Sequence, residues 1–335
     1  LFLIANAGAR INGSAVIPNS SLDATGGNIN LTATNNSNLN GVSAFLDASA
    51  RAEFATNSAG SGFGGTIAIQ SESGSRMIFS GLNINATGFG GSGATAGAGR
   101  GGDVSIGIDD AAILVRGDLF ADASGQSGFS SGTARPANAQ GGNFSFDITG
   151  ITAQFLATNF GISVDGGGAF ATVIGVPGRG ADGRGGTIDF NLNDGGVAIA
   201  SLNASAAGFG GGGGNGFGGT ANFLLGGGTH TINSLTLGAV GAGSASGPGA
   251  DAGIGTGGTV NFTALAGGSG DLTSQTINFF ADGSGGRVGT DTPGLRGSRL
   301  NGGDGNGGTI NIQLDGGHVA VTSGLYANAN GNGAN

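Results

Sequence analysis

The sequence contains no cysteine, no lysine and no tryptophan, and it has only one methionine, two histidines and five prolines. Without cysteine, disulfide frameworks and cysteine-ligated zinc sites are excluded. All eleven basic residues are arginine and the net charge is −9, which disfavours nucleic acid and anionic membranes as partners. Charged residues make up 9% of the chain. No apolar stretch approaches the roughly 18 residues of a transmembrane helix, so we expect no membrane insertion by this segment.

The most abundant residue is glycine, with 79 copies in 335 residues. Glycine costs about 1 kcal/mol relative to alanine inside a helix, which argues against helical bundles and coiled coils. Collagen is excluded because glycine does not recur at every third position. The 38% hydrophobic content, with 20 phenylalanines, is too high for a charge-driven disordered chain. We therefore expect a folded protein without helices.

One short motif recurs eight times: two glycines, any residue, and then an apolar, a polar and an apolar residue. Such regularity, with a mean spacing of about 40 residues, is typical of solenoid proteins. The copies begin at Gly26, Gly64, Gly101, Gly141, Gly185, Gly218, Gly257 and Gly307.

Each repeat has the same internal order. The motif opens a strand with period-2 alternation, as at Ile67 and Ile69. After a polar or Gly-rich turn comes a second strand, such as residues 77–79, and a Ser/Gly/Asn corner leads to a third strand. The inward residues of this third strand taper from large to small, as in Leu82, Ile84 and Ala86. A Gly-rich excursion of variable length then returns the chain to the next repeat.

One repeat cannot close a hydrophobic core, but stacked repeats bury a continuous one. We predict an all-β parallel β-helix (β-solenoid) of about eight coils, each with three short strands and a Gly-rich loop. Residues 1–335 would form a single solenoid segment. The alternative, a sandwich of hairpins, does not explain why the first strand recurs unchanged. Because the chain lacks an initiator Met and a basic leader, we expect it to be part of a longer protein.

The glycines are expected to have two roles. The Gly-Gly pair forms a corner, through either a positive φ or a close backbone approach. The Gly-rich loops either stay mobile or stack and share backbone hydrogen bonds. Phenylalanines in these loops would stack on neighbouring loops or cover an end of the core. These loop-stacking aromatics are Phe63, Phe89, Phe129, Phe209 and Phe217.

Candidate catalytic residues are scarce. His230 and His318 precede the second strand of their repeats and are expected to be exposed turn residues. Asp109 and Asp110 are neighbours in a turn, and no carboxylate cluster of a glycosidase is visible. The sequence therefore predicts neither an enzyme nor a cofactor. Calcium stays open because Gly/Asp turns near Asp182 resemble nonapeptide calcium repeats in part, although the period is wrong.

The outward positions of the first strand are regular in the later repeats, where Thr-x-Asn or Thr-x-Asp recurs. On stacked coils they form a two-column array with a spacing of about 4.8 Å. This array is either an Asn/Thr ladder whose side chains hydrogen-bond to one another or a face that binds glycan or ice. The residues are Thr187, Asp189, Thr220, Asn222, Thr259, Asn261, Thr309 and Asn311.

The repeat unit, GGTI-x-[IF] followed by tapering strands, GFGG and a Gly-rich run, resembles those of large bacterial filamentous-haemagglutinin-type and autotransporter-type exoproteins. The resemblance implies a right-handed β-helix secreted to the cell surface, where such adhesins act in adhesion, aggregation or biofilm formation. We thus expect a structural and adhesive segment of an extracellular fibre that contacts itself end to end or laterally, and host or matrix glycans. The alternatives are a polysaccharide- or ice-binding module and, less favoured, a carbohydrate-active enzyme.

Overall fold

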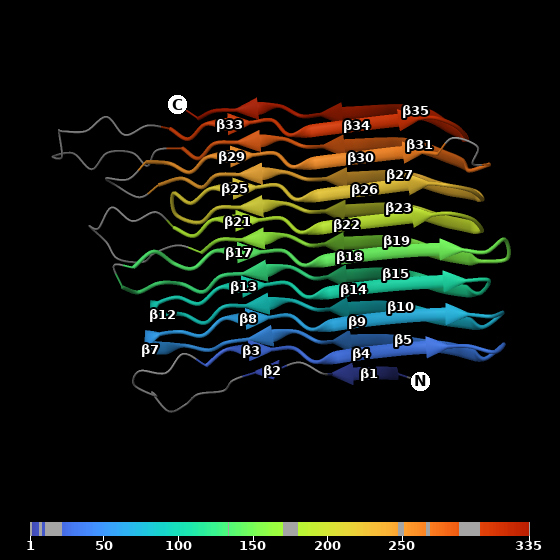
Figure 1. Ribbon diagram of the computed structural model, residues 1–335, viewed down its shortest axis with the longest axis horizontal. Coiled ribbons are helices and arrows are strands. Elements are labelled where there is room, and N and C mark those ends of the chain that lie inside the picture. Colours follow the sequence, from blue (N-terminus) through green and yellow to red (C-terminus); the bar gives the residue numbers. More distant parts are fainter. Residues whose placement is uncertain are drawn as a thin grey trace.

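The computed structural model describes residues 2–6, 9–10, 22–132, 134–169, 180–246, 251–265, 269–287 and 302–334. Within these ranges the chain is all-β without a helix, and its strands pair in parallel from one repeat to the next. The fold is a parallel β-solenoid, which confirms the prediction made from the repeat. In Figure 1 the coils are stacked one above another, from the N-terminal end at the bottom to the C-terminal end at the top.

Four sheets run along the stack, and each coil passes through them in the order sheet 1 to sheet 4. Sheet 1 is made of eight two-residue strands: β3 (Ala24–Thr25), β8 (Gly62–Phe63), β13 (Gly99–Arg100), β17 (Ala139–Gln140), β21 (Gly183–Arg184), β25 (Gly216–Phe217), β29 (Gly255–Thr256) and β33 (Gly305–Asn306). Sheet 2 takes one strand from each copy of the Gly-Gly motif: β4 (Asn28–Ala33), β9 (Thr66–Glu72), β14 (Asp103–Asp109), β18 (Asn143–Thr149), β22 (Thr187–Leu192), β26 (Thr220–Leu225), β30 (Thr259–Ala264) and β34 (Thr309–Leu314).

Sheet 3 contains the longest strands: β1 (Phe2–Asn6), β5 (Asn38–Asp47), β10 (Arg76–Asn85), β15 (Ala112–Asp122), β19 (Gln154–Ser163), β23 (Gly196–Ser205), β27 (Thr229–Gly238), β31 (Asp271–Phe280) and β35 (His318–Asn328). Sheet 4 is again short: β2 (Ala9–Arg10), β6 (Ala50–Arg51), β11 (Gly88–Phe89), β16 (Gly125–Gln126), β20 (Gly166–Gly167), β24 (Gly208–Phe209), β28 (Gly241–Ala242), β32 (Gly283–Ser284) and β36 (Gly331–Asn332). In the loops, β7 (Ala55–Ser58) pairs with β12 (Gly93–Thr95).

The prediction of three short strands per coil was wrong. Residues 77–79 and 82–84 belong to the single strand β10, and no corner separates them. At Ser80 and Gly81 the strand shows only register shifts against its neighbours β15 and β5. The physical reason is that a small polar pair is absorbed as a bulge, which leaves the strand direction intact. The two-residue strands of sheets 1 and 4 were not predicted.

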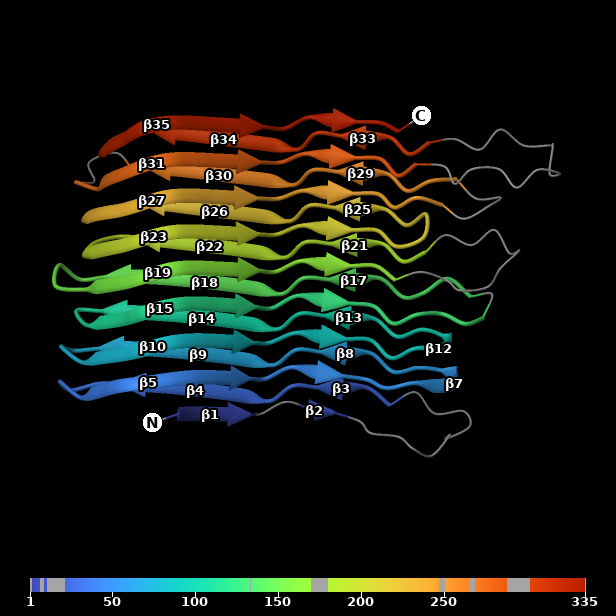
Figure 2. The same cartoon turned by 180° about the vertical axis from the view of Figure 1, so that it is seen from behind.

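The hydrophobic core lies between sheets 2 and 3, which Figures 1 and 2 show as two long layers on one side of the molecule. Ile67 and Ile69 of β9 are fully buried, as their alternation predicts. Identical positions stack from coil to coil. The rings of Phe223 and Phe262, for example, lie 5.3 Å apart and nearly parallel. This stacking buries apolar surface that one repeat could not cover alone.

The two layers converge toward sheets 1 and 4, and the inward side chains shrink in step. Along one coil the inward series is Leu82, Ile84, Ala86 and Gly88, all buried. At the narrow end a Cβ on Gly88 would lie 1.8 Å from the carbonyl oxygen of Arg100. Only glycine fits there, because backbone packs directly against backbone.

Close approach, and not a positive φ, explains the Gly-Gly pairs. A Cβ on Gly64 would lie 1.9 Å from the carbonyl oxygen of Ala86, and one on Gly65 would lie 2.0 Å from that of Gly27. Most described glycines with positive φ lie instead in the turns between sheets 2 and 3, as at Gly74. The structure therefore supports close backbone approach, rather than a positive φ, as the reason for glycine at this corner.

The described Gly-rich loops are stacked through their backbones. The amide of Gly91 donates to the carbonyl of Gly60 at 2.9 Å, that of Gly97 donates to Gly91 at 2.9 Å, and that of Gly128 donates to Gly97 at 3.0 Å. Outgoing and returning limbs of successive loops thus alternate in one hydrogen-bonded series. A second series, each member donating to the one before, connects Ala169, Ala181, Gly211, Gly214, Ser244, Gly253, Gly286, Gly303 and Ala334. Shared hydrogen bonds offset part of the entropy lost on ordering these loops.

Candidate functional site

The outward face of sheet 2 carries the predicted Thr and Asn columns in exact strand register. Thr187, Thr220, Thr259 and Thr309 pair in succession across β22, β26, β30 and β34. Two residues further along each strand, a second column follows the same order: Asp189, Asn222, Asn261 and Asn311. The structure therefore brings all eight predicted face residues together on one surface.

The amide column is a continuous hydrogen-bonded ladder. The side-chain amide of Asn222 donates to Asp189 Oδ1 at 2.6 Å. Asn261 donates to Asn222 at 2.7 Å, and Asn311 donates to Asn261 at 2.8 Å. Since the side-chain oxygens of Asp189, Asn222 and Asn261 each accept from the next coil, this column stabilises the stack.

The threonine column differs from its neighbour. Among the described residues, the hydroxyls of Thr187, Thr220 and Thr259 have no side-chain hydrogen bond, and the three side chains are half-buried. Their spacing is the strand spacing of about 4.8 Å. The face thus presents a row of methyl and hydroxyl groups beside a closed amide ladder.

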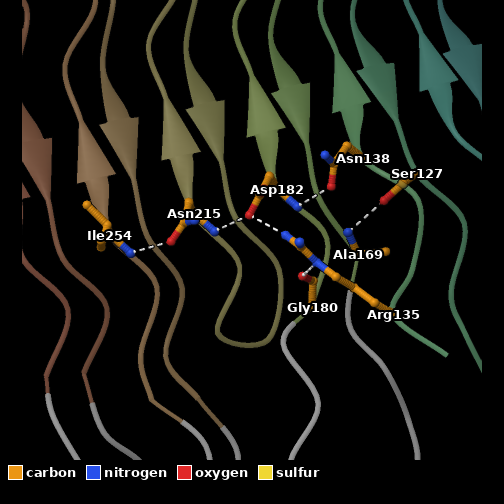
Figure 3. A network of polar contacts seen from close by, with 8 residues as sticks. All are labelled: Ser127, Arg135, Asn138, Ala169, Gly180, Asp182, Asn215 and Ile254. Atoms are coloured by element: carbon orange, nitrogen blue, oxygen red, sulfur yellow. Dashed lines mark hydrogen bonds and ion pairs between the residues drawn. The ribbon is translucent and has the colours of Figure 1, made fainter. Parts of the chain in front are cut away.

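A second polar column precedes sheet 1, where the chain returns from the loops (Figure 3). Asn138, Asp182 and Asn215 each accept, through Oδ1, the backbone amide of the next coil, at 3.0, 2.8 and 2.8 Å. Arg135 pairs with Asp182 at 2.6 Å and donates from Nε to the Gly180 carbonyl. These contacts connect successive loops, and Asp182 is engaged by Arg135 and a backbone amide.

The five loop phenylalanines lie on the outer faces of the narrow end. Phe63 and Phe217 belong to sheet 1, Phe89 and Phe209 belong to sheet 4, and Phe129 lies in the loop after β16. All five side chains are half-buried or exposed.

Two of these rings contact arginine. The Arg184 guanidinium lies 4.3 Å from the Phe217 ring centroid, and that of Arg51 lies 5.9 Å from the Phe89 centroid. Such cation–π pairs fix the orientation of the rings. The proposed effect of the phenylalanines on loop order stays a prediction.

A groove of about 330 Å³ lies beside β6, β11 and β16 of sheet 4. One wall is the register column of Arg51, Phe89 and Gln126. The other wall contains Phe54, which is 66% exposed, and Phe129, which is 49% exposed. Its further lining residues are Ala52, Glu53, Gly90, Ser92, Ser127 and Gly128.

Sequence reasoning missed this groove, although a signal was present. Phe54, Ser92 and Phe129 each lie 28 residues after the first glycine of their Gly-Gly pair, at 26, 64 and 101. Equal offsets in successive repeats place residues in one column of the solenoid.

The histidines do not form a site. His230, expected in an exposed turn, is fully buried in β27 between Val197 and Leu272 of the adjacent coils. Its Nε2 lies 2.6 Å from the Gly227 carbonyl, while Nδ1 has no partner. Burial lowers the pKa of His230, so the ring is neutral at physiological pH. His318 is exposed and occupies the neighbouring register column.

Carboxylates are dispersed in structural positions. Asp109 and Asp110 accept the Thr149 and Thr152 hydroxyls in the turns after sheet 2. Asp165 accepts hydrogen bonds from the Ser205 hydroxyl and the Ala207 amide, and burial raises the pKa of Asp165. No group of three or more His, Asp or Glu side chains in the described ranges is arranged to hold a metal ion. Calcium stays an untested prediction.

Comparison with known proteins finds no matching family model, no similar curated protein and no similar solved structure. In the part of the chain that the structure describes, no helix is long and apolar enough to cross a membrane.

Proposed function

We propose that this chain is a non-catalytic structural and adhesive segment of an extracellular bacterial surface fibre. The observation that carries the proposal is the uninterrupted stacking of four parallel sheets, of which sheets 3 and 4 contain nine strands each. Backbone hydrogen bonds, core ladders and amide ladders all run along one axis. A stack of this kind, about 40 Å tall at 4.8 Å for each coil, is a stiff spacer.

The end of the stack supports the self-association part of the proposal. At the last coil, Leu314, Leu325 and Tyr326 are 58%, 48% and 62% exposed. The outer edges of β34 and β35 have no further strand beside them among the described residues. An open parallel edge with apolar side chains is a template for another coil. Where a longer chain does not itself continue the stack with a further coil, we expect a second copy to add there end to end.

Electron micrographs of the purified chain, together with sedimentation at increasing concentration, test the fibre role. We expect rods that lengthen with concentration. The substitution Leu325→Lys places a charge at the contact and is expected to prevent lengthening, so that only single short particles are seen. Lysine at Asn203, on the outer face of β23, is the control. Compact particles of one size at every concentration would contradict end-to-end assembly.

The second candidate function is binding of polysaccharide or ice by the threonine column of sheet 2. It is favoured by the hydroxyls of Thr187, Thr220 and Thr259, which are not consumed by the neighbouring ladder. Regularly spaced methyl and hydroxyl groups match a repeating ligand better than an irregular one.

A matched pair of variants tests this face. Thr220→Lys with Thr259→Lys disrupts the column, whereas Thr231→Lys with Thr273→Lys changes two threonines of adjacent coils on sheet 3. Thermal hysteresis and polysaccharide pulldown should fall only in the first variant. Equal activity in both variants would reject the threonine face.

A further inference from the structure

The groove beside sheet 4 has a definite internal geometry. Phe54 and Phe129 lie in one column with Ser92 between them, as the hydrogen bonds from Ala55 to Ser92 and from Gly93 to Phe129 show. The phenylalanines are two inter-coil spacings apart, with one coil between them, so their Cα atoms are about 9.6 Å apart. The middle coil contributes only small residues, Gly90 and Ser92, at this place. Two exposed rings therefore flank a slot with a shallow floor.

We propose that this groove binds a neutral hexopyranose unit of a glycan chain between Phe54 and Phe129. A sugar ring held between two phenyl rings makes a van der Waals contact of about 3.5–4.0 Å on each face, so the two phenyl rings must lie about 7–8 Å apart. Side-chain rotation brings the rings to this distance from the Cα separation given above. A pyranose ring presents C–H groups on both faces, and these pack against the electron-rich faces of phenyl rings.

The polar residues of the groove favour a sugar over a purely apolar ring. Arg51 and Gln126 provide side-chain donors along one wall, and Glu53 contributes a carboxylate to the lining. The Ser92 Oγ accepts the Phe129 amide at 3.0 Å, and its own proton remains for donation to a ligand. Sugar hydroxyls both donate and accept hydrogen bonds, so they match a groove that contains both donors and a carboxylate. One positive and one negative side chain favour a neutral ligand over a charged one.

Among the described residues, the groove is lined by the three coils that contain β6, β11 and β16. Phe209 occupies the same sheet 4 column as Phe89, but the residue three positions later is Gly212, not a phenylalanine. Phe209 is 46% exposed and does not line the groove. It is therefore a matched control for an exposed phenylalanine outside the site.

Titration calorimetry of the full chain with cellohexaose, maltohexaose and mannohexaose tests the proposal. We expect at least one of them to bind, and Phe54→Ala and Phe129→Ala each to weaken binding by roughly threefold to tenfold. Phe209→Ala should leave the affinity unchanged, and Phe129→Tyr should keep it. Binding should also protect amides of residues 89–92 and 126–129 from hydrogen exchange in the unaltered protein.

The contrary outcomes are distinct. If none of the three oligosaccharides binds, or if Phe209→Ala weakens binding as much as Phe129→Ala, the proposal is wrong. A proline hexapeptide that binds in their place would assign the groove to polyproline ligands, whose turn of about 9.3 Å also spans two coils. The rods expected of the fibre role do not depend on occupation of the groove, so this test and the micrographs of the fibre role can fail independently.

Discussion

Replacing a single glycine at the narrow end tests whether backbone-to-backbone packing holds the solenoid together. In Gly64→Ala, the new Cβ would lie 1.9 Å from the Ala86 carbonyl oxygen, whereas ordinary contact begins near 3.4 Å. The two backbones must separate by about 1.5 Å. Hydrogen bonds from Gly64 to Arg100 and from Gly102 to Ala86, at 2.9 and 2.8 Å, lie at this contact. Losing two to three buried backbone hydrogen bonds costs about 3 to 6 kcal/mol.

Gly81→Ala is the matched control in the same coil. The nearest atom to its Cβ would be the Asp118 carbonyl oxygen at 3.8 Å, so the methyl group fits without strain. We expect a gain of about 0.4–1 kcal/mol from the reduced entropy of the unfolded chain. Urea unfolding followed by circular dichroism compares the two variants. Hydrogen exchange should localise the loss to the narrow end, because stacked repeats open locally. Equal urea midpoints for both variants would refute the packing argument.

Three further substitutions address polar groups in the stack. Asn261→Ala breaks the amide ladder on both sides and should cost about 1–2 kcal/mol in urea unfolding, while Thr263→Ala on the same strand should be nearly neutral. Asp165 has a raised pKa, so the folded state holds its proton more tightly and stability falls as pH rises through the raised pKa. Asp165→Asn should therefore exceed the parent in urea midpoint at neutral pH, and the difference should shrink toward acid; a constant difference would contradict the assignment. His230 has a lowered pKa, so the unfolded state binds the proton more readily and stability is lost as pH falls below the ordinary histidine pKa. His230→Leu should remove that acid-induced loss, whereas His318→Leu should not.

The sequence predicted the solenoid because a stacked fold repeats its local rules in every coil. Ile67 and Ile69 are buried where the alternation places them, and the Gly-Gly pairs lie at points of close approach. The merging of two expected strands into β10 was not predictable from Ser80 and Gly81 alone. A small polar pair is compatible with either a corner or a bulge, and pairing with the neighbouring coils decides between them.

His230 shows where a prediction of burial from neighbouring residues in the sequence fails. Thr229 and Thr231 flank His230, and this polar stretch after a Gly-rich turn is typical of an exposed position. In register, however, His230 lies between Val197 and Leu272, which face the core. The burial of His230 is decided by the residues at the same register position in adjacent coils and not by its neighbours in sequence. The same holds for the Phe54 and Phe129 groove, which appears only when equal offsets in different repeats are compared.

The glycine content follows from the shape of the coil. Sheets 2 and 3 stand apart by the thickness of two side-chain layers, while sheets 1 and 4 are in backbone contact, as Gly62 and Gly88 show. A coil that closes from one thickness to the other must lose side-chain volume step by step, and the series from Leu82 to Gly88 does so. At the narrow end the inward residues are glycine or, as at Ala24, Ala50 and Ala139, alanine, so little side-chain volume remains to confer specificity. The strand register there depends on backbone hydrogen bonds and on outward groups such as Phe89. The aromatic and arginine side chains of this edge therefore face solvent, where a ligand can reach them.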